Sequence, residues 1–215
     1  MSDPAPLVYA LLLHGVQGPD SLRASEQRFL SEAGAHLAGR GSKFVGDAIE
    51  KGQTGPDRRR DLSGSPVFLI LAPLVPGAST EDVKRAAAAF DLCATRSEAW
   101  LLRERFAREE RKRLDEEAWL QLVMMNIEPA NEDEFNEWYE AEHVARIAAV
   151  APEFVSVQRL EAIEGAPRHH ALWRLTDRKA PERDPWLSAS ETPWTTRIRR
   201  FMRDRRRLLL APLAT

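Results

Sequence analysis

The sequence predicts an α+β protein made of two tandem βαββαβ units. Short apolar runs typical of strands alternate with segments of helical periodicity, and the same order of elements appears in each half of the chain. A segment of mixed charge, residues 103–117, separates the halves and is expected to be a solvated strand end and linker. We therefore place one unit in residues 1–110 and the other in residues 118–215.

In the first half, the expected strands are apolar runs that end at turn residues, and the expected helices begin at capping residues. The first helix has Asp20 or Ser21 as its expected N-cap, and the second has Ser79 or Thr80. The strands are predicted at 7–16, 42–52, 65–75 and 97–107, and the helices at 19–39 and 79–96.

The second half repeats this order. Asn131 is the expected cap of its first helix, whose first turn is acidic and so complements the helix dipole. Pro193 interrupts its second helical region. The strands are predicted at 118–129, 154–165, 168–177 and 203–213, and the helical regions at 131–150 and 184–202. We interpret the repeated order as an internal duplication.

A βαββαβ unit of this kind is the ferredoxin-like motif, a four-stranded antiparallel sheet with two helices on one face. Its other sheet face is apolar and has to be buried. Two units in one chain solve this if their sheets pack face to face in a barrel-like core with the helices outside.

The composition favours a soluble protein with a substantial core. Of the 215 residues, 43% are hydrophobic and 30% are charged, and the net charge is −2. This balance argues against nucleic acid as a partner. The N-terminal apolar run is too short for a membrane span and lacks the basic start of a signal peptide. With the single Cys93, most simply a small core residue, these features predict a cytoplasmic protein without a membrane partner.

One region resembles a known family. The stretch "EFNEWYEAEHVARIAAVAPEFVSVQRLEAIEGAPRHHALWRL" is similar to the helix-to-strand region of dimeric α/β-barrel proteins, in particular the EthD-like group. Glu153 stands where that group commonly has glycine, and the likeness covers roughly residues 118–210. The resemblance implies an intramolecular dimeric α/β-barrel. The superfamily contains cofactor-free isomerases, cyclases and monooxygenases as well as haem-binding enzymes, so the fold does not decide the activity.

Tyr139 and His143 are the candidate catalytic residues. They are four positions apart, which places them on one face of a helix. Histidine is suited to proton transfer near neutral pH, and a tyrosine one turn away can donate a hydrogen bond to a developing oxyanion. Trp138 and Glu142 form the neighbouring pair. The alternative is that Trp138 packs on the sheet and His143 only caps the last carbonyls of the helix.

Other polar residues have two possible roles. Asn126 and His14 follow apolar runs at equivalent strand positions, so each needs a partner, in a structural hydrogen bond or in a ligand. His169 and His170 are adjacent on a strand and point to opposite faces, which argues against a shared metal ion. No other cluster has the spacing of metal ligands, and we predict no metal.

The second half contains most of the tryptophans and one cluster of arginines. The six tryptophans are expected mostly in the core, but Trp173, Trp186 and Trp194 could instead wall an aromatic pocket. The segment "RIRRFMRDRRR" at 197–207 contains seven arginines. Its default interpretation is a solvated helix end and an edge strand, and attraction of an anionic substrate is the alternative.

Together these features favour an enzyme over a binding protein. We expect general acid/base chemistry without a cofactor on a small apolar or aromatic carbonyl or phenol compound, by isomerisation, dehydration, cyclisation or decarboxylation. His143 and Tyr139 would be catalytic, and the substrate would contact Asn126, Trp138, Glu142, Trp173 and Trp194. The alternatives are a non-catalytic ligand-binding or structural pseudo-dimer and a haem-binding barrel. Either a monomer or a homodimer fits the sequence.

Overall fold

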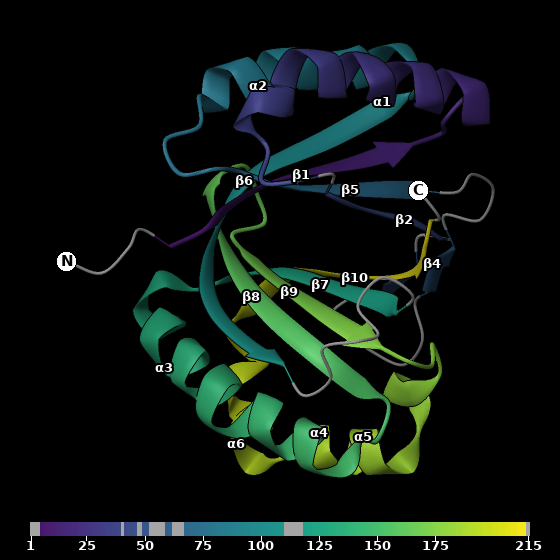
Figure 1. The fold of residues 1–215 in the computed structure, drawn as a ribbon. Helices are drawn as coiled ribbons and strands as arrows, with labels where there is room; N and C mark the ends of the chain where they lie inside the picture. The colour runs from purple at the N-terminus through teal and green to yellow at the C-terminus, as the bar shows by residue number, and fades with distance from the viewer. Residues whose placement is uncertain are drawn as a thin grey trace.

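The computed structural model describes residues 5–39, 41–46, 49–51, 59–61, 67–109 and 118–213. A closed barrel occupies its centre, with one layer of helices above it and another below (Figure 1). The upper helices come from the first half of the chain and the lower ones from the second. The predicted α+β class and the helices outside a central barrel are confirmed.

In the described residues of the first half there are six strands and two α-helices, and a 3₁₀ turn follows each helix. The strands are β1 (Leu7–His14), β2 (Ser42–Gly46), β3 (Ile49–Lys51), β4 (Arg59–Asp61), β5 (Val67–Pro73) and β6 (Arg96–Glu109), and the helices are α1 (Pro19–Ala33) and α2 (Thr80–Ala87). The 3₁₀ turns are η1 (Gly34–His36) and η2 (Ala88–Leu92). Ser79 caps α2, since its hydroxyl accepts a hydrogen bond from the Asp82 amide at 3.2 Å, as predicted. The predicted cap of α1 is wrong, because this helix begins after Gly18 with no side-chain cap.

Among the described residues, the second half contains four strands, and its predicted first helix has four parts. The strands are β7 (Trp119–Ile127), β8 (Phe154–Glu164), β9 (His169–Leu175) and β10 (Met202–Pro212). The first helical region comprises η3 (Pro129–Asn131), α3 (Glu132–Glu137), the π-helix η4 (Trp138–His143) and α4 (Val144–Val150). The second comprises η5 (Ala180–Glu182), α5 (Asp184–Ser190) and α6 (Pro193–Ile198). Asn131 is the N-cap residue of α3, but its side chain does not make the predicted capping hydrogen bond.

Both halves have the same strand order. The barrel order β1-β5-β2-β10-β7-β9-β8-β6 contains two four-stranded sheets, β6-β1-β5-β2 and β10-β7-β9-β8. Along the chain, the first and third of the four strands in each sheet are central, which is the ferredoxin-like arrangement. Antiparallel pairing of β10 with β2 and of β6 with β8 closes the barrel. A common origin of the halves and the boundaries at 110 and 118 stay predictions.

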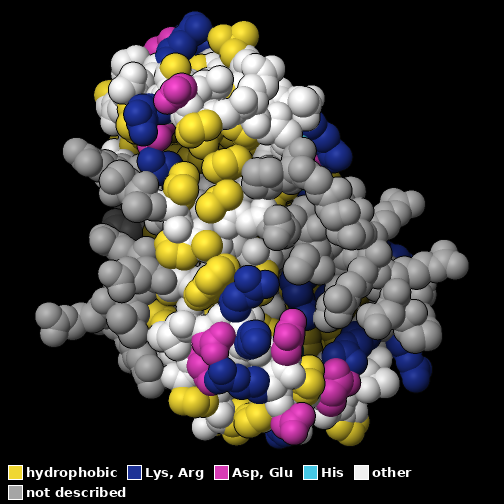
Figure 2. Space-filling model, turned by 90° about the vertical axis from the view of Figure 1, so that its right-hand side faces the viewer, with side chains coloured by type: hydrophobic (Ala, Val, Ile, Leu, Met, Phe, Trp, Pro, Cys, Tyr) yellow, Lys and Arg dark blue, Asp and Glu magenta, His cyan; other side chains and the backbone are white. Residues whose placement is uncertain are grey.

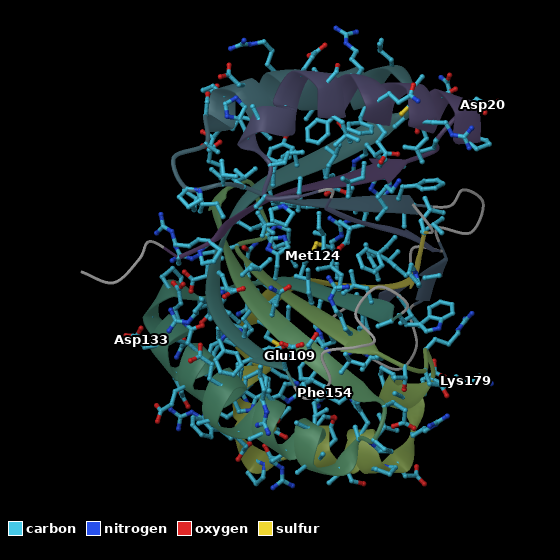
Figure 3. All side chains as sticks on the ribbon, viewed as in Figure 1. Asp20, Glu109, Met124, Asp133, Phe154 and Lys179 are labelled. Atoms are coloured by element: carbon cyan, nitrogen blue, oxygen red, sulfur yellow. The ribbon has the colours of Figure 1, made fainter. Side chains whose placement is uncertain are left out.

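The core has three layers. Side chains that point inward from both sheets, including Leu12, Leu69, Leu120 and Met124, fill the barrel. Met124 lies in the middle of the structure between the sheets (Figure 3). The opposite faces of the sheets pack against the helices of their own halves. A strand residue therefore faces either the barrel interior or a helix layer, and alternation along the strand decides which.

Charges of both signs are mixed on the surface. On the face seen in Figure 2, hydrophobic side chains lie between the two helical layers, and Lys, Arg, Asp and Glu side chains are interspersed on the lower half. In the described part of the chain, no helix combines the length and the apolar character required to cross a membrane.

Two predicted segments differ in detail. The single strand predicted at 42–52 corresponds to β2 and β3, and β3 pairs with β4 in a separate two-stranded sheet. The segment 203–213 read as an edge strand, but β10 is paired on both sides, with β7 and β2. The second difference changes the role of the arginines on β10, because a strand inside a closed barrel has one face directed at a helix layer.

Candidate functional site

A π-helix positions the two candidate catalytic residues. Within η4 the Val144 amide donates its hydrogen bond to the Tyr139 carbonyl, five residues earlier. The wider turn places positions i and i+5 side by side, so the His143 ring stacks on Trp138 with centroids 4.5 Å apart and an interplanar angle of 29°. His143 also contacts Tyr139, with centroids at 5.0 Å. π-Helical turns inside α-helices occur often at functional sites, and here one brings His143 against both aromatic rings.

The π-helix also separates Glu142 from Trp138. Regular helical spacing pairs these residues, but the Glu142 carboxylate instead accepts a hydrogen bond from the Thr192 hydroxyl at 2.6 Å. The Trp138 indole N–H donates to Thr195 Oγ1 at 3.2 Å, and Thr192 Oγ1 also caps α6 by accepting from the Thr195 amide. This network fixes the Trp138 ring against α6 and directs Glu142 away from the histidine.

The His143 imidazole is held neutral. Burial is the main cause that lowers its pKa, to about 3, and the charges of Arg205, Arg199 and Arg207 lower it further. Its Nδ1 is buried and has no hydrogen-bond partner among the described residues. No carboxylate is among the main causes of this shift, and the surrounding arginines make the imidazole a weaker base. At neutral pH the group is therefore available as a base and not as a general acid.

Tyr139 is a buried, protonated phenol with an available proton. Burial raises its pKa, and the positive charge of Arg159 opposes that rise. The hydroxyl oxygen accepts a hydrogen bond from the Trp173 indole at 3.0 Å. Within the described part of the chain, no group accepts the phenolic proton. The Arg159 guanidinium carbon lies 4.4 Å from the centre of the phenol ring, in a cation–π contact with it.

These residues border a cavity of about 270 Å³ between the second-half sheet and its helices. Its aromatic wall comprises Trp138, Tyr139, Trp173 and Trp186, and the last two rings meet edge to face at 5.2 Å. Gln121 and Ser190 add polar groups to the wall. The volume is close to the lower end of the range for small-molecule sites, and a few polar groups in an aromatic cavity are typical of such sites.

Three arginines complete the wall. Arg199 follows α6, and Arg205 and Arg207 lie on β10. A β-bulge between Arg203 and Arg206 inserts one extra residue opposite β7, and Asp204 within it has a φ of 52°. The bulge shifts the alternation of β10, so that Arg205 and Arg207 face the helix layer. The sequence interpretation of these arginines as solvated is therefore wrong for Arg205 and Arg207.

Of the residues proposed to contact a substrate, Trp138 and Trp173 line the cavity and three others do not. Asn126 lies outside it, donating a hydrogen bond to Asp204 at 2.9 Å and accepting one from the Arg168 amide at 2.8 Å. Glu142 is directed at Thr192, as described above. The Trp194 indole donates to Glu134 at 3.1 Å. In the structure these three side chains make contacts that support the fold.

Three other histidines, at positions 14, 169 and 170, lie outside the cavity. His14 Nε2 is 2.9 Å from Glu98, which also binds Arg206 through both carboxylate oxygens and so links the two halves. His169 and His170 point to opposite faces as predicted, since His169 contacts Phe135 in the helix layer and His170 contacts Trp100.

One group of side chains could hold a metal ion. Glu132, Glu161 and His169 place one ligand atom each within 4.8 Å of one another. Both carboxylates are already neutralised, Glu132 by Arg168 at 2.9 Å and Glu161 by Arg105 at 3.2 Å. A cation would have to displace these arginines, so the cluster favours ion pairs over metal binding.

The cavity does not fit haem in this geometry. A porphyrin is larger than a space of about 270 Å³. An axial histidine needs one nitrogen directed at the iron with free space around it, whereas the His143 ring is stacked on Trp138 and meets Trp173 edge to face at 5.8 Å. We therefore assign no step of the chemistry to a haem group.

Comparison with known proteins shows the fold. No protein-family model and no curated protein matches the chain. Solved structures do match over nearly the whole length. A candidate monooxygenase of Fusobacterium nucleatum subsp. nucleatum has a TM-score of 0.61 and 10% identity, with 99% of this chain and 94% of that chain covered. An anthrone oxidase-like protein has a TM-score of 0.61 and 12% identity, with 99% and 93% covered.

A third match names the architecture. A ferredoxin-fold protein of Listeria monocytogenes, related to antibiotic biosynthesis monooxygenases, has a TM-score of 0.53 and 9% identity, with 98% of this chain and 96% of that chain covered. Because identities are this low, the three likenesses show the ferredoxin-like barrel and leave the activity open. The narrower assignment to the EthD-like group stays a prediction.

Proposed function

We propose that this protein is an enzyme that moves protons on a small aromatic or apolar carbonyl or phenol compound and needs no cofactor. One observation carries the proposal. A neutral imidazole, His143, and a phenol with an available proton, Tyr139, border the same aromatic cavity. A base and a hydrogen-bond donor next to each other are the two groups that enolate chemistry requires.

In the proposed mechanism His143 is the base. It takes a proton from a carbon next to the substrate carbonyl, or from a phenol, and becomes an acid only after it holds that proton. Tyr139 donates its hydrogen bond to the substrate oxygen, on which negative charge develops. The Trp173 N–H donates a hydrogen bond to the Tyr139 oxygen, so this oxygen already acts as an acceptor. The phenolic proton of Tyr139 is then available for a hydrogen bond to the ligand.

The protonated histidine determines what the enolate becomes. Returning the proton to a different carbon is an isomerisation, and delivering it to a leaving hydroxyl group is a dehydration. An enolate that meets molecular oxygen would instead be oxygenated, and the likeness to an anthrone oxidase-like protein makes this outcome worth testing. All these reactions share one first step, so that step is the one to measure.

The test is proton exchange in D₂O. The purified protein is incubated with a panel of aryl ketones and phenols, and NMR follows the loss of the exchangeable C–H signal. We expect His143→Ala to lose exchange by at least about a hundredfold, in the range of general-base contributions. Glu137→Gln, on the exposed face of the same helical region, is the matched control and should exchange at the wild-type rate. An oxygen electrode on the same mixtures separates oxygenation from isomerisation.

The same variants test the two alternatives. If the aromatic cluster only holds the fold together, His143→Ala should unfold the protein, because His143 packs against Trp138, Tyr139 and Trp173. If His143→Ala folds and the wild-type protein exchanges no proton on any compound, a ligand-binding pseudo-dimer is favoured. A Soret band in the purified protein would favour the haem-binding alternative and contradict the proposal of a cofactor-free enzyme.

A further inference from the structure

The cavity has an excess of positive charge. Arg199, Arg205 and Arg207 face it, and Glu191 is the one acidic residue in its described wall. Glu191 is already used, since both of its carboxylate oxygens bind Arg199. For Arg205 and Arg207, no carboxylate lies within ion-pair distance in the part of the chain that the structure describes. Two guanidinium groups therefore face the cavity without a counter-charge.

This arrangement is costly for the empty protein. Arg207 Nε is buried and has no hydrogen-bond partner among the described residues. Burial lowers the pKa of Arg207 to about 10, and the neighbouring charge of Arg205 adds to the effect. Burial likewise lowers the pKa of Arg205. A partly buried cation without a counter-charge destabilises a fold, so an anion that enters the cavity would find two donors that are already partly desolvated.

The bulge in β10 decides which arginines of the strand face the cavity. It turns Arg205 and Arg207 toward the cavity, while Arg206 on the other face binds Glu98. Of these three neighbouring arginines, Arg206 has a carboxylate partner. Arg205 and Arg207, on either side of it, have none among the described residues. Arg205 and Arg207 are both partly buried at the cavity wall, so full solvation does not replace the missing acidic partner.

We infer that the cavity binds a small aromatic carboxylate, whose carboxylate group lies against Arg205 and Arg207 and whose ring lies among Trp138, Trp173 and Trp186. The inference rests on the proposed function and names its substrate class. The planar guanidinium fork matches the two oxygens of a carboxylate. The aromatic walls and the volume of about 270 Å³ suit a single substituted ring better than a bare inorganic anion.

Binding of such an anion would also activate the base. The positive charges of Arg205, Arg199 and Arg207 all help to lower the pKa of His143. The negative charge of a bound carboxylate would oppose the effect of these arginines on the pKa of His143. The charges of Glu191 and of Arg159, which lies against the Tyr139 ring, would stay the same. His143 would become a stronger base only when the charged substrate is in place, which selects the anion over neutral analogues of the same shape.

The test compares charged and neutral ligands of equal shape. Tryptophan fluorescence and calorimetry measure the Kd of salicylate, of the neutral amide salicylamide, and of inorganic phosphate. We expect salicylate to bind at least tenfold more tightly than the other two. Arg205→Gln and Arg207→Gln should lose this preference. Arg203→Gln, which removes an exposed arginine of the same strand that binds Glu128, is the matched control and should keep it.

Thermal unfolding separates this role from a structural one. Since each Gln substitution removes a buried charge without a partner, the Tm of the empty variants should equal or exceed that of the wild type. Salicylate should raise the Tm of the wild type and of Arg203→Gln, and of neither cavity variant. Unfolding of Arg207→Gln, equal affinity for salicylamide, or phosphate that binds as tightly as salicylate would each overturn the inference.

The outcome is independent of turnover. Binding with the charge preference but without proton exchange would leave the carboxylate site standing and remove the proposed reaction. Proton exchange on neutral ketones without any preference for salicylate would support the proposed reaction and remove the carboxylate site. His143→Ala should still bind salicylate within a fewfold, because the carboxylate is placed on the arginines.

Discussion

His170 gives a direct test of the barrel interior. Its side chain is 2% exposed and meets Trp100 edge to face at 5.2 Å, and neither ring nitrogen has a hydrogen-bond partner of normal geometry among the described residues. Burial lowers its pKa from 6.5 to about 3, with a smaller contribution from Arg206, while the Arg168 main chain opposes the shift. We predict that this histidine makes the protein sensitive to mild acid.

The sign follows from the two pKa values. The unfolded chain binds a proton near pH 6.5 and the folded chain only near pH 3, so the stability contribution is complete above pH 6.5 and is lost as the pH falls. The loss is about 1.4 kcal/mol for each pH unit in that window, or about 2 kcal/mol at pH 5. Folded domains commonly have about 5–15 kcal/mol of stability in total, so this loss is measurable.

The perturbation is His170→Leu, which replaces the ring by an apolar side chain. At pH 7.5 we expect a change in unfolding free energy of no more than about 1 kcal/mol, because the variant no longer buries two nitrogens without partners. Between pH 6.5 and pH 5 the variant should lose about 2 kcal/mol less than the wild type. Urea unfolding followed by far-UV circular dichroism at a series of pH values measures both numbers.

A control makes the result specific. Met124 is the register partner of His170 on β7 and also lies inside the barrel. Met124→Leu conserves volume and removes no titrating group, so its pH dependence should match that of the wild type. The reasoning fails if His170→Leu keeps the wild-type pH dependence, or if NMR shows the His170 ring titrating near pH 6.5.

Three further predictions concern the links between elements. Glu98→Gln should destabilise the fold by about 2 kcal/mol at pH 7 in urea unfolding, because it removes the carboxylate that binds both Arg206 and His14, and a loss below about 0.5 kcal/mol would contradict this. Thr192→Val should lower stability by about 1 kcal/mol, because the Thr195 amide loses its cap, while Thr192→Ser should restore it. Equimolar Zn²⁺ should leave the Tm unchanged, whereas a rise that His169→Gln abolishes would show a metal site.

The helix around Tyr139 shows how far periodicity predicts a site. Helical spacing correctly brings Tyr139 and His143 together, since positions i and i+4 share a face. It also pairs Trp138 with Glu142, and that pairing is wrong because the π-helical turn stacks Trp138 on His143. A π-helix depends on contacts that a wide turn gains with its surroundings, here the hydrogen bond from Trp138 to Thr195, and spacing alone does not reveal them.

For the arginines of β10, by contrast, the sequence itself contains the spacing that places two of them on one face. Arg205 and Arg207 are two positions apart in a strand and so share a face. The default interpretation is a solvated cluster, because charge runs usually are solvated, and attraction of an anionic substrate is the alternative. The pairing of β10 with β2 decides otherwise, since it removes the free edge and leaves a helix layer over one face. That partner comes from the other half of the chain.

The sequence by itself determined the order of elements, the α+β class and the barrel flanked by helices, because hydrophobic periodicity and turn residues are local properties of the chain. Only the tertiary structure decided which side chains share the cavity. Strand register, the bulge in β10 and the π-helix each move a side chain from one face to another, and each depends on contacts between residues far apart in sequence. Asn126 illustrates this: its partner Asp204 is 78 residues away, within the bulge that turns two arginines toward Tyr139 and His143.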